Sequence, residues 1–297
     1  MKIKGSLTAF TLSDIYKILG ISGLIGIIIR AIQMVKFIDN GTGFTTGGTP
    51  FSIALILLIA ATVTAFMVKG YVSAESSKIQ LPGIKSKTLG AATLFFSLTL
   101  LFDFVSGFTS MGDTAAMGDF KNLMLTGTMP RFIQSIFAAF AAFYFLILAK
   151  DYLKGTQKAS KHRILAITPV GWAGFRMVSR FVRQISFIKV SDLFYELIML
   201  AFMLIFFMAF AQVISGVYSD GFEWRIPSFG ASAALIAGIL SVPRLIFTFV
   251  GYDNYINPQH TFQITDLAFV VFIFVFVATV CKKINPYTAY GEENGEE

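Results

Sequence analysis

Hydrophobic residues in this chain gather into eight long runs, which polar connections separate. A helix needs about 20 predominantly apolar residues, within a range of about 17–25, to cross the hydrocarbon core of a bilayer. We therefore predict an all-α, polytopic integral membrane protein, a bundle of eight transmembrane helices. The predicted spans are Ile15–Phe37, Phe51–Val68, Thr88–Gly107, Arg131–Ala149, Ile164–Ile188, Asp192–Val217, Ser228–Val250 and Ile264–Cys281. Residues 1–284 form one transmembrane domain, and the acidic tail 285–297 is expected to be disordered in the cytoplasm.

The fifth segment, Ile164–Ile188, permits two interpretations. It carries Arg176, Arg180 and Arg183, which share one helical face because they are four and three residues apart. A basic amphipathic helix lying on the cytoplasmic surface of the membrane would have such a face. This alternative gives seven spans plus one amphipathic interfacial helix, and it places the Lys282–Lys283 pair outside the cell. We favour eight spans.

Lysine and arginine cluster in alternate connections. The N-terminus, the second and fourth connections and the segment after the last span are rich in these residues, whereas the first, third and seventh connections are poor in them. Cytoplasmic loops of membrane proteins carry such an excess of positive charge. Both termini are therefore expected in the cytoplasm, and the eight spans form four helical hairpins.

Composition agrees with a membrane protein. Hydrophobic residues make up 55% of the chain and charged residues 14%, and the mean hydropathy is +0.71, whereas soluble domains carry about 25% charged residues. The net charge of +7 comes with lysines in short loops, as expected for loops that face anionic lipid. We therefore expect the lipid bilayer of a plasma membrane as a partner and no nucleic acid. Both a homo-oligomer and a hetero-oligomer are consistent with the sequence.

Few residues suit metal binding or catalysis. Cys281 is the single cysteine, which excludes an internal disulfide and a cysteine metal cluster. His162 and His260 lie in polar connections and have no partner at a ligand spacing. The chain contains no nucleotide-binding motif and no hydrolase or metalloprotease motif. We therefore expect no metal, no cofactor and no enzymatic activity.

At three places an arginine in a hydrophobic run is followed nine residues later by an aspartate. The pairs are Arg30 and Asp39, Arg183 and Asp192, and Arg244 and Asp253. Charges inside membrane-spanning helices are costly, so they usually mark a functional site or a forced pairing. The pattern indicates repeated helical units that are related by an axis along the membrane normal.

Charges on the outgoing helices are expected at one depth. Arg30, Asp103, Arg180 and Arg244 each lie 15 or 16 residues beyond the start of their span. This spacing corresponds to roughly 23 Å across a hydrocarbon core of roughly 30 Å. Glu196 and Asp266 approach the same level from the outer ends of returning helices.

Three interpretations account for these charges. The arginines can extend to the outer interface, or the charges can form structural ion pairs that hold helices together, or they can line a polar cavity that is open to the outside. The short side chain of Asp103 requires a partner, for which we predict Arg30 first and Arg244 second. The candidate solute-binding residues are Arg30, Asp103, Arg176, Arg180, Arg183, Glu196, Arg244 and Asp266.

An arginine-lined cavity suits a carboxylate or a phosphate. The leading hypothesis is thus a transporter or permease-like protein that engages a small anionic solute, with Asp103 as gate partner or proton carrier. The alternative is a non-catalytic membrane component: a sensor, an assembly factor or a subunit of a larger complex. A third hypothesis is an enzyme that acts on lipid phosphates of the outer leaflet.

The connection after the first span contains Ile38, Asp39, Thr42, Gly43 and Phe44 in the order Ile-Asp-x-x-Thr-Gly-Phe. This string and the multi-span layout resemble those of uncharacterised multispanning membrane proteins of Gram-positive bacteria. The resemblance implies a bacterial source and carries no function over to this chain.

Overall fold

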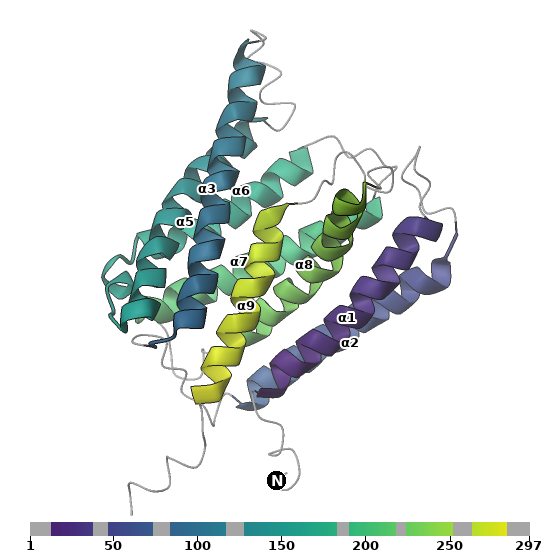
Figure 1. Cartoon of the computed structure of the whole chain (residues 1–297), viewed down its shortest axis with the longest axis horizontal. Coiled ribbons are helices and arrows are strands. Elements are labelled where there is room, and N and C mark those ends of the chain that lie inside the picture. The colour runs from purple at the N-terminus through teal and green to yellow at the C-terminus, as the bar shows by residue number, and fades with distance from the viewer. Residues whose placement is uncertain are drawn as a thin grey trace, which may run out of the picture.

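The computed structural model describes residues 13–37, 47–73, 84–116, 128–182, 190–217, 224–251 and 263–283. These residues form eight α-helices and two short 3-10 helices, and they contain no strand (Figure 1). The α-helices are α1 (Ser13–Lys36), α2 (Thr49–Ser73), α3 (Lys87–Ala116), α5 (Thr128–Lys154), α6 (Thr168–Val182), α7 (Val190–Ile214), α8 (Arg225–Val250) and α9 (Ile264–Lys283), and the 3-10 helices are η1 (Ala159–Lys161) and η2 (Leu165–Ile167). The all-α prediction is confirmed.

Each of the eight predicted segments overlaps with one of the α-helices. The largest boundary error is at α3, which continues nine residues beyond the predicted end at Gly107 and projects past its neighbours in Figure 1. In this extension the hydroxyls of Thr109 and Ser110 donate to the carbonyls of Ser106 and Gly107. These polar residues satisfy their hydrogen bonds inside the helix, so a drop in hydropathy does not end it.

Six of the helices are long and apolar enough to cross a membrane, namely α1, α2, α3, α5, α7 and α8. Helix α9 contains a shorter apolar stretch, Ile264–Thr279. The fifth predicted span is represented by η2 and by α6, which has 15 residues and a length of about 22 Å, below the roughly 30 Å of a hydrocarbon core. The helices are compatible with a multi-pass membrane protein.

Helices that follow one another along the chain pack as antiparallel neighbours. Contacts join α1 to α2, α3 to α5, α6 to α7, and α8 to α9. In Figure 1 the α1–α2 hairpin lies on one side and the α3–α5 hairpin on the other, with α8 and α9 between them. Helix α1 begins and α9 ends at the same end of the bundle, as an even number of passes requires.

Helix α8 is the central element. It contacts α1, α2, α7 and α9, and nearly all its residues from Ile226 to Ser241 are buried. Two glycines permit this close packing. A Cβ atom at Gly26 of α1 would come within 2.5 Å of the Ile239 side chain of α8, and one at Gly70 of α2 would overlap Ser228 of α8. The Ser228 hydroxyl in turn donates to the backbone carbonyl of Phe66 across 2.9 Å.

Apolar side chains fill the interior and also cover the outer faces. Inside, the rings of Phe96 on α3, Phe145 on α5, Phe207 on α7 and Phe272 on α9 pack with centroids 4.9–6.3 Å apart. Outside, large apolar residues stay exposed along several helices, for example Ile21, Leu24, Ile53, Leu57, Leu98, Phe102, Phe140 and Phe143. A soluble monomer rarely exposes so much apolar surface, whereas lipid would cover it.

Candidate functional site

Charged side chains meet in the interior of this apolar bundle. Of the eight candidate residues, Arg30, Asp103, Arg176, Arg180, Glu196, Arg244 and Asp266 are between 2 and 8% exposed. Buried charges require paired charges or hydrogen bonds, so their partners decide what the region can do. Asp39, Arg183 and Asp253 lie outside the described residues, and so does the side chain of Asp192. The Arg-x8-Asp pairs therefore stay a prediction.

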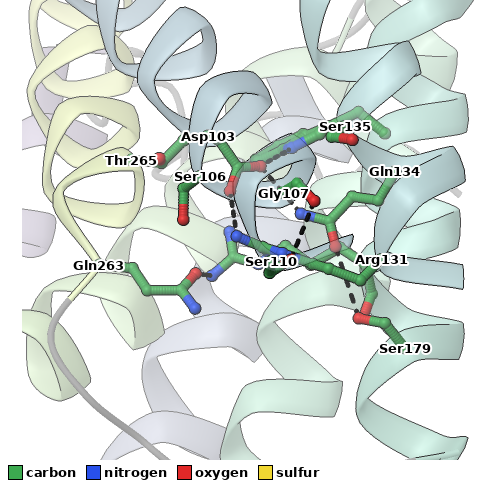
Figure 2. Close-up of polar contacts among 12 residues, drawn as sticks. Asp103, Ser106, Gly107, Ser110, Arg131, Gln134, Ser135, Ser179, Gln263 and Thr265 are labelled. Carbon is green, nitrogen blue, oxygen red and sulfur yellow. Dashed lines mark hydrogen bonds and ion pairs between the residues drawn. The ribbon is translucent and has the colours of Figure 1, made fainter. Parts of the chain in front are cut away.

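Asp103 of α3 accepts hydrogen bonds from three side chains. Arg131 Nη2 and Gln134 Nε2 of α5 donate to its two oxygens across 2.8 Å each, and Trp172 Nε1 of α6 donates across 2.7 Å. Figure 2 shows Asp103, Arg131 and Gln134 converging. The expectation that Asp103 contacts an arginine of another helix is confirmed.

The choice of that arginine was wrong, since Arg131 takes the place predicted for Arg30 or Arg244. Arg30 lies on α1, whose contacts are with α2, α8 and α9, whereas α3 packs most extensively on α5. The hairpin neighbour therefore supplies the partner. Gln134 also links this cluster to α6, because the Ser179 hydroxyl lies 3.4 Å from its Oε1.

Arg176 of α6 forms a two-pronged ion pair with Asp266 of α9. Its Nη1 lies 2.6 Å from Asp266 Oδ1, and its Nη2 donates to Oδ2 across 2.8 Å. The same Nη2 donates to Gln263 Oε1, just before α9, across 2.5 Å, and the guanidinium carbon lies 5.4 Å from the Trp172 ring centroid. One of the two prongs, from Nη2 to Oδ2, is a hydrogen bond, and such charge-assisted bonds are stronger than neutral ones.

Glu196 of α7 is shared by two arginines from different helices. Arg244 Nη1 of α8 donates to Glu196 Oε1 across 2.7 Å, and Arg180 Nε of α6 lies 3.4 Å from Oε2. A single carboxylate therefore bridges α6 and α8 through α7.

Arg30 of α1 completes the network. It donates to Gln33 Oε1 across 3.2 Å, and Gln33 in turn donates to Ser52 of α2 across 3.1 Å. Its guanidinium carbon lies 6.0 Å from the ring centroid of Tyr195, and it is close enough to interact electrostatically with Glu196 and Arg244. Arg30 thus belongs to the Glu196 cluster rather than to the Asp103 cluster.

One face of α6 organises these contacts. Trp172, Arg176 and Arg180 are spaced four residues apart, so they share a face, and they contact Asp103, Asp266 and Glu196 on three other helices. A helix lying on the membrane surface would direct its basic face toward lipid headgroups. The basic face of α6 is instead buried in the bundle.

The network carries an excess of positive charge. Within the described residues it contains five arginines (Arg30, Arg131, Arg176, Arg180 and Arg244) and three acids (Asp103, Glu196 and Asp266). Five positive charges less three negative ones leave an excess of two.

A pocket of about 250 Å³ opens beside this network, between α3, α5, α6 and the start of α9. Its lining residues are Phe102, Asp103, Ser106, Ser110, Arg131, Ser179, Arg180, Gln263, Ile264 and Thr265. Two of these side chains are apolar. The others supply two guanidinium groups, one carboxylate, four hydroxyls and one amide, and Figure 2 shows most of them. This set offers many donors to a solute and an excess of one positive charge.

Several residues of the site were missed by the sequence analysis. Arg131, Gln134, Trp172 and Gln263 were not among the candidates, although they contact the candidate charges directly. A signal for Arg131 existed, because it lies near the start of its predicted span, as Glu196 and Asp266 do.

Metal ligands do not gather in the described part of the chain, where no group of three or more His, Cys, Asp or Glu side chains could hold an ion. His162 is exposed in the connection between α5 and α6. His260 and the side chain of Cys281 lie outside the described residues.

Comparisons with protein-family models, with curated proteins and with solved structures find no match to this chain. The string from Ile38 to Phe44, which carries the resemblance to multispanning proteins of Gram-positive bacteria, lies outside the described residues.

Proposed function

We propose that this chain is a multi-pass protein of a bacterial plasma membrane, with eight transmembrane helices and both termini in the cytoplasm. Six long apolar helices and the apolar outer faces support the membrane assignment. The buried basic face of α6 supports a path through the bundle rather than along the membrane surface. The alternate distribution of lysines in the connections supports the orientation.

We further propose that the protein is a transporter or permease-like protein that binds a small anionic solute in the pocket beside Asp103. The observation that carries this proposal is the pocket itself, which is polar inside an otherwise apolar bundle. Two arginines, Arg131 and Arg180, and a single carboxylate, that of Asp103, line the pocket. Charge interactions are stronger in such surroundings than in water. An anion would bring the pocket close to neutrality.

The size of the pocket limits the solute. A small organic acid or inorganic phosphate fits a volume of about 250 Å³. The headgroup phosphate of an outer-leaflet lipid is an alternative source of the same anionic chemistry.

Movement of a solute requires helices that can shift. Pro243 lies inside α8, directly before Arg244, and a proline removes one backbone hydrogen bond of its helix and favours a kink. Because Arg244 binds Glu196, which also faces Arg180, a change in α8 would reach the pocket through two ion pairs.

A second candidate function is a non-catalytic membrane component in which the charges hold the helices together. The observation in its favour is that each of the three acids of the charged network, Asp103, Glu196 and Asp266, contacts at least one arginine. Buried ion pairs of this kind can set the positions of helices without binding any solute.

Ligand-dependent stability separates the two candidates. In purified protein, sodium lactate, sodium succinate, sodium phosphate and glycerol phosphate are added at constant ionic strength, and thermal unfolding is followed. A ligand at 100 times its Kd stabilises the folded protein by about 2.7 kcal/mol. We expect at least one probe to raise the Tm, and Arg180→Gln and Arg131→Gln to abolish that rise.

The matched control is Arg163→Gln, since Arg163 is exposed in the connection between α5 and α6 and does not line the pocket. It should keep the ligand response of the wild type. Uptake of the binding probe into proteoliposomes then tests transport. No response to any probe, or a response that survives both pocket substitutions, would contradict the proposed site, and binding without uptake would favour the non-catalytic component.

A further inference from the structure

Arg180 faces the pocket on one side and Glu196 on the other. Its side chain belongs to the pocket lining, together with Arg131 and Asp103. Its Nε atom lies 3.4 Å from Glu196 Oε2, and Glu196, which is 3% exposed, does not belong to the lining. A single guanidinium can therefore bind either an anion in the pocket or the carboxylate of the protein.

The contact between Arg180 and Glu196 is longer than three other ion pairs of the network. Those pairs have closest distances of 2.8 Å (Arg131 with Asp103), 2.6 Å (Arg176 with Asp266) and 2.7 Å (Arg244 with Glu196). Charge-assisted hydrogen bonds between nitrogen and oxygen are typically about 2.7–2.9 Å long. The contact of Arg180 with Glu196 is thus looser than these three pairs.

Glu196 has a second cation that can retain it. Arg244 donates to Oε1 across 2.7 Å, so Glu196 would stay paired if Arg180 turned toward the pocket. Leaving a buried carboxylate without any partner would be strongly unfavourable. The sharing of Glu196 avoids this cost, and Arg180 can change partners while the bundle keeps its charges paired.

We propose that Glu196 competes with the solute for Arg180, a role that rests on the proposed anion site. When the solute binds, its anionic group takes the Arg180 guanidinium, and Glu196 remains with Arg244. The solute is a small carboxylate, because the group that it replaces at Arg180 is itself a carboxylate. The exchange also loosens α6 from α7, so solute binding changes a contact between helices.

This role makes an unusual prediction about affinity. Loss of a buried acid next to a binding site normally lowers the stability of the protein. Here it should also raise the affinity for the solute. Glu196→Gln removes the internal competitor, and we expect it to tighten binding of the carboxylate probes, sodium lactate and sodium succinate, about tenfold or more. The measurement is the concentration dependence of the thermal shift for the full chain in detergent.

The matched control is Asp151→Asn, which removes one negative charge from a buried acid at the opposite end of α5. It tests whether the gain is a general effect of net charge, and it should leave the probe affinity within about twofold of the wild type. Glu196→Asp keeps the charge but withdraws the carboxylate by one methylene group. It should give a smaller gain in the same direction, which keeps the test decisive if Glu196→Gln fails to fold.

A second measurement follows the accessibility of the Arg180 side chain directly. Phenylglyoxal modifies accessible guanidinium groups, and mass spectrometry locates the adduct. Modification of Arg180 should be faster in Glu196→Asp and Glu196→Gln than in the wild type, and lactate or succinate should protect it.

The outcomes separate this inference from the proposed function. Probe binding with equal affinity in the wild type and both Glu196 variants would overturn the role of Glu196 and leave the anion site standing. Tighter binding of phosphate than of either carboxylate would overturn the assignment of the solute class. No binding of any probe in any variant would overturn the anion site and this inference together.

Discussion

Three donors from two helices converge on the Asp103 carboxylate, and this convergence gives the residue a large effect on stability. Arg131, Gln134 and Trp172 all direct a nitrogen at it. Because the carboxylate is buried, its removal would leave each donor without its acceptor. The Arg131 guanidinium would then be a charge without its partner in a poorly solvated site, which destabilises the folded state by more than the lost attraction to Asp103.

A double-mutant cycle tests this pairing. Asp103→Ala should lower the free energy of unfolding by about 3–5 kcal/mol, since it leaves the Arg131 charge without its partner in a poorly solvated site. Asp103→Ala combined with Arg131→Ala should cost clearly less than the sum of the two single changes. Thermal stability in detergent of the two single variants and the double variant measures the coupling.

The control cycle pairs Asp103→Ala with Arg163→Ala, because Arg163 is exposed and does not contact the site. These two effects should add to within about 0.5 kcal/mol. Additive effects in the Asp103–Arg131 cycle itself would mean that the ion pair does not contribute to stability.

The sequence selected the charged residues that are buried, but their side-chain partners could not be predicted. Counting residues from the start of each span selected Arg30, Asp103, Arg180 and Arg244, and all four are buried. Choosing partners requires knowledge of which helices are neighbours, and hydropathy contains no such information. For this reason Arg131, on the other helix of the same hairpin, was not predicted as the partner.

At the scale of the helices, α6 shows why the fifth segment was ambiguous. A basic stripe on a short helix suits a membrane surface as well as it suits a bundle whose acids lie elsewhere in the sequence. The acids that pair with this basic stripe, Glu196 and Asp266, belong to α7 and α9. Likewise, the polar extension of α3 beyond Gly107 is stabilised by hydrogen bonds within the helix, which a hydropathy profile does not register.

Close packing between α1 and α8 depends on the absence of a side chain at Gly26. Gly26→Ala should destabilise the protein by about 1–3 kcal/mol, because the new methyl group overlaps Ile239 and forces the helices or that side chain to shift. Thermal unfolding in detergent measures the loss.

Gly20→Ala on the same helix is the matched control. A Cβ atom at Gly20 meets nothing within 4 Å, so this change should be neutral or stabilise the helix by up to about 1 kcal/mol. Equal effects of the two substitutions would show that α1 and α8 do not approach each other closely at Gly26.

At the scale of the whole molecule, the helices assemble as four contacting hairpins. Their number and order were predicted from the alternation of apolar runs and charged connections. Their arrangement was not, since the sequence does not indicate that α8 lies in the centre or that α1 and α2 pack on it. The near-continuous burial of α8 reflects its small residues, such as Gly230, Ala234 and Gly238, which could equally line a helix facing lipid.

The orientation of the bundle is tested by cysteine labelling in a Cys281→Ser background. A cysteine at Gly41 or Asn254 should react with an impermeant thiol reagent in intact cells, because these connections are expected outside. A cysteine at Ser77 or Gln157 should react only after the cells are opened. Gln157 is preferred to Thr156, whose hydroxyl donates to Asp151 and would be lost.

Labelling at Gln157 but not at Asn254 in intact cells would contradict this orientation. Labelling at both Gln157 and Gly41 would contradict the odd number of passes (α2, α3 and α5) between them.

The packing of α1 and α2 on α8 also sets an order of events during synthesis. About half the chain lies between the end of α2 at Ser73 and the start of α8 at Arg225. At a translation rate of about 5–20 residues per second, the first hairpin waits about 10–30 s before its main neighbour emerges. During that interval the Ile239 side chain that packs on Gly26 is still missing. We expect chaperones and proteases to recognise the incomplete hairpin, and any delay in making the last hairpin lengthens its exposure to them.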